Sequence, residues 1–186
     1  MTRASELLEQ LGTYVPADAL EALHHASIIG LLSTTAAPFS RQQFTPGHIT
    51  ASCFIIEGDR LLLHHHKRLD RWLQMGGHVD GDESPVQTAL REGAEESGLR
   101  DLELVFDEVF DLDVHAIPAG KGEPDHRHFD VRFLARTAFP EAISIDPSES
   151  NDLAWVALDR AVALMNEEAS TRVIRKIERT RDRRHA

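Results

Sequence analysis

Three glutamates, Glu92, Glu95 and Glu96, have the spacing i, i+3 and i+4, so on a helix they would share one face. Glu92 and Glu96 repel each other and would destabilise an isolated helix by roughly a few tenths of a kcal/mol. Arg91 pairs at i+4 only with Glu95, so it relieves part of this repulsion. A bound cation would relieve the rest, and oxygen ligands favour Mg²⁺ or Mn²⁺ over zinc. A solvated charged face is the alternative interpretation.

The residues around these glutamates predict a helix from Pro85 to Ser97. Ser84 is a favourable N-cap, proline suits the first helical position, and Gln87 completes a capping box. Gly98 follows the last helical residue, where a left-handed C-cap favours glycine. The glutamates would therefore stand on a helix with well-defined ends.

The stretch from Gly77 to Leu99 resembles the Nudix box, G-x5-E-x7-R-E-U-x-E-E-x-G-U, in which U is a bulky aliphatic residue. All the fixed positions match, and they are Gly77, Glu83, Arg91, Glu92, Glu95, Glu96 and Gly98. From ordinary residue usage, a chance match in a chain of this length is on the order of one in a million. One position departs from the pattern: Gly93 stands at the first U, where the box has a bulky aliphatic residue. Val86, Leu90 and Gly93 form the core-facing stripe, so the glycine predicts closer packing of helix on sheet, at a helix-propensity cost of roughly 1 kcal/mol.

This resemblance implies a Nudix hydrolase, which cleaves a pyrophosphate bond in a nucleoside diphosphate linked to another group. The metal ligands that it implies are Glu92, Glu95, Glu96 and the Gly76 carbonyl, binding Mg²⁺ or Mn²⁺. Arg91 would orient Glu92 through an ion pair, and Glu83 would support the metal site.

The general base varies within this family between the Glu92 position and a glutamate outside the box. Outside the box, the best candidate is Glu149, six residues before Trp155, and Asp152 is the second. For both residues an exposed loop acid is the alternative interpretation.

A histidine-rich stretch lies between two predicted strands and forms a second candidate site. It contains His115, Lys121, His126, Arg127, His128 and Asp130. His126, His128 and Asp130 would share one face of a strand, which is compatible with a transition-metal site. We favour a wall or lid in which His126 and His128 contact the variable group of the substrate. Arg127 and Arg132 are candidate phosphate clamps.

Strands before and after a central helix, followed by a C-terminal helix, indicate an α/β layered domain. The resemblance implies a Nudix α/β/α sandwich with a mixed sheet, and the predicted N-terminal helices lie outside it as an extension. The predicted strands are His48–Glu57, Leu61–His66, Trp72–Met75, Leu102–Ile117 (one bent strand or two), Phe129–Arg136 and Leu153–Leu158.

We expect three parts: a helical extension and loop over residues 1–45, with two helices broken near Gly12–Pro16, a Nudix domain over 46–170, and a basic C-terminal helix over 171–186. The last part holds seven basic and two acidic residues. It could be a solvated helix face, a pairing surface for the acidic body or a phosphate contact, and we favour the first.

The net charge of −11 argues against a general affinity for nucleic acids or anionic membranes. Cys53 is the only cysteine, so no internal disulfide can form, which suits a reducing cytosol. No early apolar run is long enough for a signal sequence or a membrane span. We expect a cytoplasmic protein that acts on a small nucleotide and has no nucleic-acid or membrane partner. A homodimer is compatible with these features.

Two alternatives share the fold. An isopentenyl diphosphate isomerase usually has a degenerate box and a cysteine-rich site, and neither is present here. A non-catalytic ligand sensor tends to lose the box glutamates and to carry a DNA-binding domain, and no such domain is visible. The substrate stays unassigned, because the sequence signatures of the ADP-ribose, dinucleoside-polyphosphate and NADH enzymes of this family are missing.

Overall fold

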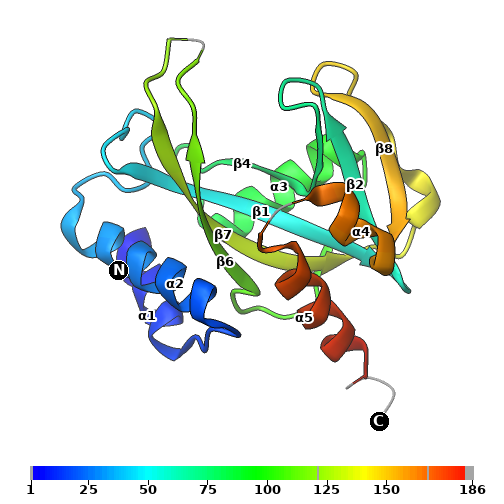
Figure 1. Ribbon diagram of the computed structural model, residues 1–186, viewed down its shortest axis with the longest axis horizontal. Coiled ribbons are helices and arrows are strands. Elements are labelled where there is room, and N and C mark those ends of the chain that lie inside the picture. Colours follow the sequence, from blue (N-terminus) through cyan, green and yellow to red (C-terminus); the bar gives the residue numbers. More distant parts are fainter. Residues whose placement is uncertain (1, 121, 167, 183–186) are drawn as a thin grey trace.

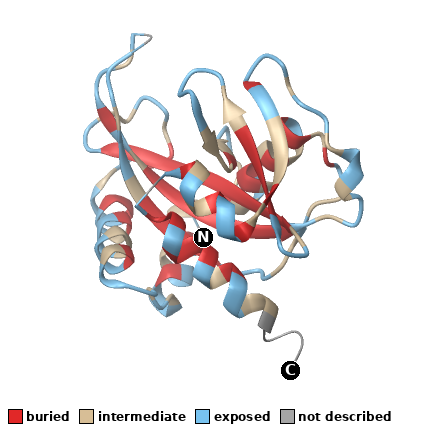
Figure 2. Ribbon diagram, turned by 45° about the vertical axis from the view of Figure 1, so that its right-hand side comes forward, coloured by how far each residue is buried: buried red, intermediate tan, exposed pale blue. Residues whose placement is uncertain are grey.

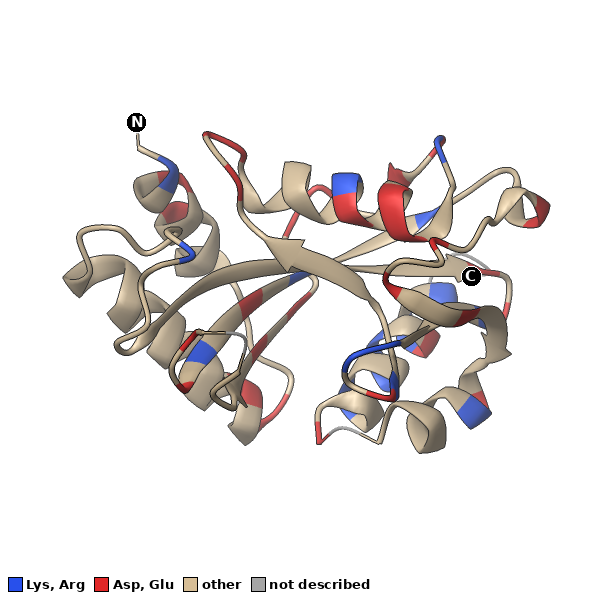
Figure 3. Ribbon diagram, turned by 90° about the horizontal axis from the view of Figure 1, so that it is seen from above, with Lys and Arg blue, Asp and Glu red and all other residues tan. Residues whose placement is uncertain are grey.

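The computed structural model describes residues 2–120, 122–166 and 168–182. Lys121 of the histidine-rich stretch and the end of the basic tail, 183–186, lie outside these residues. A mixed, curled sheet forms the centre, with helices on both of its faces (Figure 1). Seen from above, α3 lies on one side of the sheet and the C-terminal helices on the other (Figure 3). This is the α/β layered architecture that the sequence predicts.

The helices are α1 (Arg3–Thr13), α2 (Ala19–Thr34), α3 (Pro85–Ser97), α4 (Leu158–Met165) and α5 (Ser170–Asp182), with a 3₁₀ turn η1 at Pro140–Ala142. The strands are β1 (Gly47–Glu57), β2 (Arg60–His66), β3 (Arg71–Leu73), β4 (Met75–His78), β5 (Glu103–Leu104), β6 (Asp111–Ile117), β7 (His126–Arg136) and β8 (Ser150–Ala157).

The sheet has the order β3-β2-β1-β7-β5 along its main path. Strands β1 and β7 run parallel, and the other pairs are antiparallel. On its other edge β1 pairs with β2 near its end and with β4 near its middle. Strand β8 extends the sheet beyond β2, and β6 pairs with β7 as a long hairpin (Figure 1). Strand β1 is therefore the centre to which the other parts are attached.

Local signals predict several elements correctly. The first two helices are separated near Gly12–Pro16, and α3 has the predicted ends. The Ser84 hydroxyl accepts the Gln87 N–H while the Gln87 side chain accepts the Ser84 N–H, and Gly98 has φ +76°. The segment from 102 to 117 holds two strands rather than one bent strand.

Three strand predictions are corrected. The single strand expected over Trp72–Met75 is two short strands, β3 and β4, which pair with different neighbours. Strand β7 begins at His126 rather than Phe129, because the histidine-rich residues pair with β6 in the hairpin. Strand β8 begins at Ser150 rather than Leu153, because its first residues pair with the end of β2.

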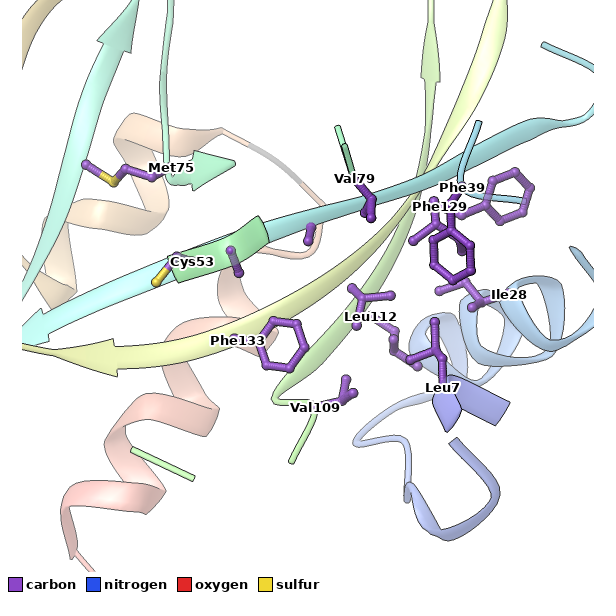
Figure 4. Close-up of a cluster of buried hydrophobic side chains, with 14 of the residues drawn as sticks. Leu7, Ile28, Phe39, Cys53, Met75, Val79, Val109, Leu112, Phe129 and Phe133 are labelled. Carbon is purple, nitrogen blue, oxygen red and sulfur yellow. The ribbon is translucent and has the colours of Figure 1, made fainter. Parts of the chain in front are cut away.

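The N-terminal helices are part of the main hydrophobic core. Leu7 of α1 and Ile28 of α2 are buried in one cluster with Phe129 of β7 and Leu112 of β6 (Figure 4). A second cluster lies under α4 and α5. Burial is concentrated along the long central strands between these clusters (Figure 2).

Close packing of α3 on the sheet explains the glycine that departs from the box. A Cβ atom at Gly93 would lie 2.9 Å from Leu102 Cδ1 and 3.3 Å from Cys53 Cβ. The prediction of closer packing is therefore confirmed. Cys53 is fully buried at this contact, and burial raises the pKa of its thiol to about 12.

A buried network of charges ties both ends of the chain to β6. Arg172 Nε donates to Asp111 at 2.9 Å, and Lys176 Nζ donates to the same carboxylate at 2.9 Å. Lys176 also pairs with the fully buried Glu21 of α2. Burial alone would raise the pKa of Asp111, but Arg172, with the charges of Arg132 and Lys176, lowers it. The prediction of a solvated basic face is wrong for Arg172 and Lys176, because their charges pair with the acidic body.

None of the helices in the described part of the chain is both long and apolar enough to cross a bilayer.

Replacing Arg172 by Met should lower the free energy of unfolding by about 3 kcal/mol, because it removes one partner of a buried ion pair. Arg175 stands one turn later on α5 and is exposed. Arg175→Met, which makes the same change in charge, should cost less than about 0.5 kcal/mol. Urea unfolding of both variants measures the difference, and equal stabilities would contradict the role assigned to the network.

Candidate active site

Strand β4 and helix α3 bring two of the box glutamates together. Glu96 is only 4 % exposed, and its Oε2 accepts the Gly76 N–H at 2.9 Å. Glu92 lies against Gly77, where a Cβ atom would stand 2.3 Å from Glu92 Oε1. A side chain at position 77 would therefore displace the Glu92 carboxylate from this position.

Arg91 holds Glu92 in place. Its Nη1 donates to Glu92 Oε1 at 2.9 Å, so the ion pair that the resemblance implies is present. Arg91 Nε donates to Glu83 Oε1 at 2.9 Å, and the Thr88 hydroxyl donates to the same carboxylate. These hydrogen bonds, with that from Arg91 the largest effect, lower the pKa of Glu83. Glu83 therefore positions Arg91, which in turn positions Glu92.

Glu95 shares Arg91 Nη1 with Glu92 and its charge acts on Glu92, but Glu95 is more exposed than the other two box glutamates. Its side chain is exposed and accepts a hydrogen bond from Arg91 Nη1 at 3.1 Å. Glu92 and Glu96 lie against Gly77 and Gly76 of β4, whereas the Glu95 side chain is exposed to solvent. A role for Glu95 in metal binding stays a prediction.

The loop before β8 brings Glu149 to this site. The Lys67 N–H donates to the Glu149 carbonyl at 2.8 Å, which fixes the loop to the end of β2. The Glu149 carboxyl raises the pKa of Glu96, and its charge raises that of Glu92 as well. Asp152 is exposed on β8 opposite His65. Of the two candidates outside the box, the structure places Glu149 beside the box glutamates.

The electrostatics of these carboxylates favour a cation. The pKa of Glu96 is raised to about 9, chiefly by burial; the charge of Glu92 and the hydrogen bond and charge of Glu149 act in the same direction, whereas the hydrogen bond from the Gly76 N–H lowers the pKa. Burial also raises the pKa of Glu92, although Arg91 acts in the opposite direction. Carboxylates that destabilise each other's charge when buried are stabilised by a hard divalent ion. The residues present therefore fit Mg²⁺ or Mn²⁺.

The histidine-rich stretch is arranged differently from the prediction. His126 and His128 share one face of β7, but Asp130 is occupied by Thr50, Ser52 and Arg132, which donate to it at 3.1, 2.7 and 2.9 Å. The alternative in which Asp130 joins the two histidines at a metal is therefore wrong. The third member is His48 of β1, which lies opposite His128 in the parallel register. Sequence reasoning missed His48, because pairing between strands 80 residues apart leaves no local signal.

The two arginines predicted to bind phosphate, Arg127 and Arg132, lie in different environments. Arg132 is 1 % exposed and pairs with Asp111, Asp113 and Asp130. The prediction that Arg132 binds a substrate phosphate is wrong, because three aspartates enclose its guanidinium. Arg127 is exposed on β7, and its phosphate contact stays a prediction.

A family model of the NUDIX domain matches residues 46–177, which is well over half of the chain. The chain belongs to the Nudix family. The probable DHNTP pyrophosphohydrolase of Lactococcus lactis subsp. cremoris (strain MG1363) is 31 % identical over 140 residues, which cover 74 % of this chain and 81 % of the relative. This Nudix protein is thus a hydrolase that acts on pyrophosphate bonds.

Solved structures agree with this fold. A NUDIX-family hydrolase from Clostridium perfringens is 28 % identical, with a TM-score of 0.53 over 70 % of this chain and 96 % of that one. The binary complex of a C. elegans Ap4A hydrolase has a TM-score of 0.57 at 22 % identity, over 70 % of this chain and 94 % of that one. At this identity the second likeness concerns the fold alone.

Replacing Glu92 by Gln in this Nudix hydrolase keeps the side-chain shape but removes its charge. We expect kcat to fall by at least about a hundredfold if Glu92 binds metal or acts as a base. Glu103→Gln, an exposed change of the same kind on β5, is the matched control and should leave kcat within about twofold. A Glu92→Gln variant that keeps half of its activity would show that the box is structural here.

Proposed function

We propose that this protein is a pyrophosphohydrolase dependent on Mg²⁺ or Mn²⁺, in which Glu92 and Glu96 hold the metal and Glu149 serves as general base. One observation carries the proposal. Glu96 is held by the Gly76 N–H in a buried position where the neighbouring charges of Glu92 and Glu149 are both negative. Such a group needs a cation to be ionised at neutral pH.

The bound metal would neutralise charge on the substrate phosphates and lower the pKa of an attacking water. The chain itself supplies orientation. Arg91 fixes the Glu92 carboxylate from one side, while Gly77 leaves the space that this carboxylate fills. Because Glu83 holds Arg91 through hydrogen bonds, the arrangement is in place before substrate binds.

Glu149 is better suited than Glu92 to accept a proton from water. Arg91 Nη1 donates to Glu92 Oε1, so the Glu92 carboxylate is already held in place as a candidate metal ligand. Glu149 reaches the same site from the loop before β8, and its own hydrogen bond there is to Glu96.

For the substrate, we propose a nucleotide-like molecule that carries a diphosphate linked to another group. The Lactococcus relative is named for DHNTP, which makes DHNTP the first compound to test. The single cysteine is buried, which fits a reducing compartment such as the cytosol. We place the enzyme there.

The alternative functions have less support. A thiol on Cys53 could not reach an isoprenoid substrate, because Cys53 is fully buried against α3. A ligand sensor without activity would not need the intact set of box glutamates, and the relative is named as a pyrophosphohydrolase.

A panel of DHNTP and nucleoside diphosphate derivatives, read by phosphate release, tests the proposed function. With Mg²⁺ at least one compound should be hydrolysed, and excess chelator should abolish turnover because the carboxylates alone cannot neutralise the phosphates. Coupling to a phosphatase detects products that are monophosphates. Turnover that is unchanged in chelator would contradict the metal dependence.

Glu149→Gln distinguishes the two candidates for a base outside the box. We expect kcat to fall by at least about a hundredfold, since a positioned base contributes about that much or more. Asp152→Asn is the matched control, because Asp152 is exposed on β8 three residues away. If the two variants lose equal activity, or if only Asp152→Asn loses it, the assignment of Glu149 is wrong.

A further inference from the structure

Five histidines gather on one face of the sheet, outside the carboxylate site. His48 of β1 and His128 of β7 are register partners, with ring centroids 4.9 Å apart. His126 lies 5.2 Å from each of these two rings. The ring centroids of His78 and His115 lie 5.1 and 5.6 Å from that of His128. A stack of this density has no evident role in packing a hydrophobic core.

Three of these rings have nitrogen atoms close to one another. One ligand atom each from His48, His126 and His128 lies within 4.8 Å of the other two. The Nε2 atoms of His126 and His128 are 3.3 Å apart and make a hydrogen bond, whose proton a metal ion would replace. In a tetrahedral zinc site with Zn–N bonds of 2.0–2.1 Å, neighbouring nitrogens are separated by about 3.3–3.4 Å. The spacing of this pair already matches two ligands of one ion.

Backbone carbonyls set the tautomers of two rings. His48 Nδ1 lies 3.1 Å from the Gln43 carbonyl, and His126 Nδ1 lies 2.8 Å from the Pro124 carbonyl. A carbonyl only accepts, so each Nδ1 carries the proton and each neutral ring keeps its lone pair on Nε2. Metal-binding histidines are oriented in this way by the partner of their other nitrogen.

The buried Nε2 of His48 is the second observation that points to a ligand. His48 is 1 % exposed, and its Nε2 has no hydrogen-bond partner among the residues that the structure describes. A buried polar atom left unpaired costs about 1–3 kcal/mol. The Nε2 of His78 is also buried without a partner in the described chain, so His78 is the candidate for a fourth ligand.

The backbone conformation just before His48 lets strands β1 and β7 approach each other closely. Gly47 has φ +145°, and a Cβ atom there would lie 2.0 Å from the Arg127 carbonyl oxygen. Only glycine lets the start of β1 come this close to the start of β7. The close approach sets His48 opposite His128 in the register.

We propose that His48, His126 and His128 bind one transition-metal ion, with zinc as the best match to three imidazoles in a tetrahedral arrangement. Imidazole selects zinc and similar ions, whereas the carboxylates of Glu92 and Glu96 select magnesium. The ion would join the start of β1 to the β6–β7 hairpin. This site is independent of the proposed function, since it uses none of the residues assigned there.

Zinc content tests the proposal. Protein made without a polyhistidine tag, stripped with chelator and dialysed against ZnCl₂, should hold about one zinc ion per chain by elemental analysis. His126→Asn with His128→Asn should hold less than about a tenth of that. His65→Ala, on β2, and Glu92→Gln should each keep the full equivalent, because His65 and Glu92 lie outside the set.

Thermal unfolding gives an independent readout. Zn²⁺ should raise the Tm of the wild-type protein and leave that of the double variant unchanged, since only the native wild-type protein binds it. Visible absorption on titration with Co²⁺ should show a tetrahedral site in wild type. Circular dichroism in chelator checks that the double variant folds; if it does not, the single variant His128→Asn should bind zinc at least about tenfold more weakly.

Failure of the wild-type protein to retain zinc would overturn the proposal, as would equal zinc in wild type and variants. A double variant that changes KM or substrate ranking in zinc-free protein would favour a substrate wall instead. Loss of hydrolysis in Glu92→Gln, with zinc retained, would bear on the carboxylate site alone.

Discussion

The close packing of strand β4 against helix α3 is the constraint on which the site depends. Gly77 leaves the space that the Glu92 carboxylate fills, and the Gly76 N–H holds Glu96. Strand β4 is also paired with β1, which fixes its place beside the helix. The same strand ends at His78, whose ring borders the histidine cluster. One short strand therefore supports both the carboxylate site and the candidate zinc site.

A network of buried charges fixes the positions of the sheet strands around β4. Asp111 of β6 receives hydrogen bonds from Arg172 of α5, while Arg132 of β7 links it to Asp130. Glu21 brings α2 into the same network through Lys176. A buried ion pair adds little net stability compared with apolar side chains of similar size. Removing one of its two partners is costly, because the other charge is then left buried without a partner. Segments that look like extensions in the sequence are thus fixed to the strands that carry the histidines.

Local sequence signals predict the helix of the site, whereas the long-range contacts could not be read from them. Ser84 and Gly98 mark the ends of α3, and a spacing of three or four residues suffices to place its glutamates. The neighbour of His128 is His48, which is set by a parallel register between distant strands. Arg132 looks like an exposed phosphate ligand in the sequence, yet it is buried because aspartates on two strands meet it there. A pattern of period two predicts a strand but not its partner.

The most direct test of this account is the position of a divalent ion in crystals grown with Mn²⁺. An anomalous difference map should show manganese between the carboxylates of Glu92 and Glu96, beside Gly76 of β4. The Glu92→Gln protein, crystallised in the same way, should show a weaker peak or none. A wild-type map without a peak at these carboxylates, or with manganese bound only elsewhere on the chain, would contradict the claim that the packing of β4 on α3 builds a metal site.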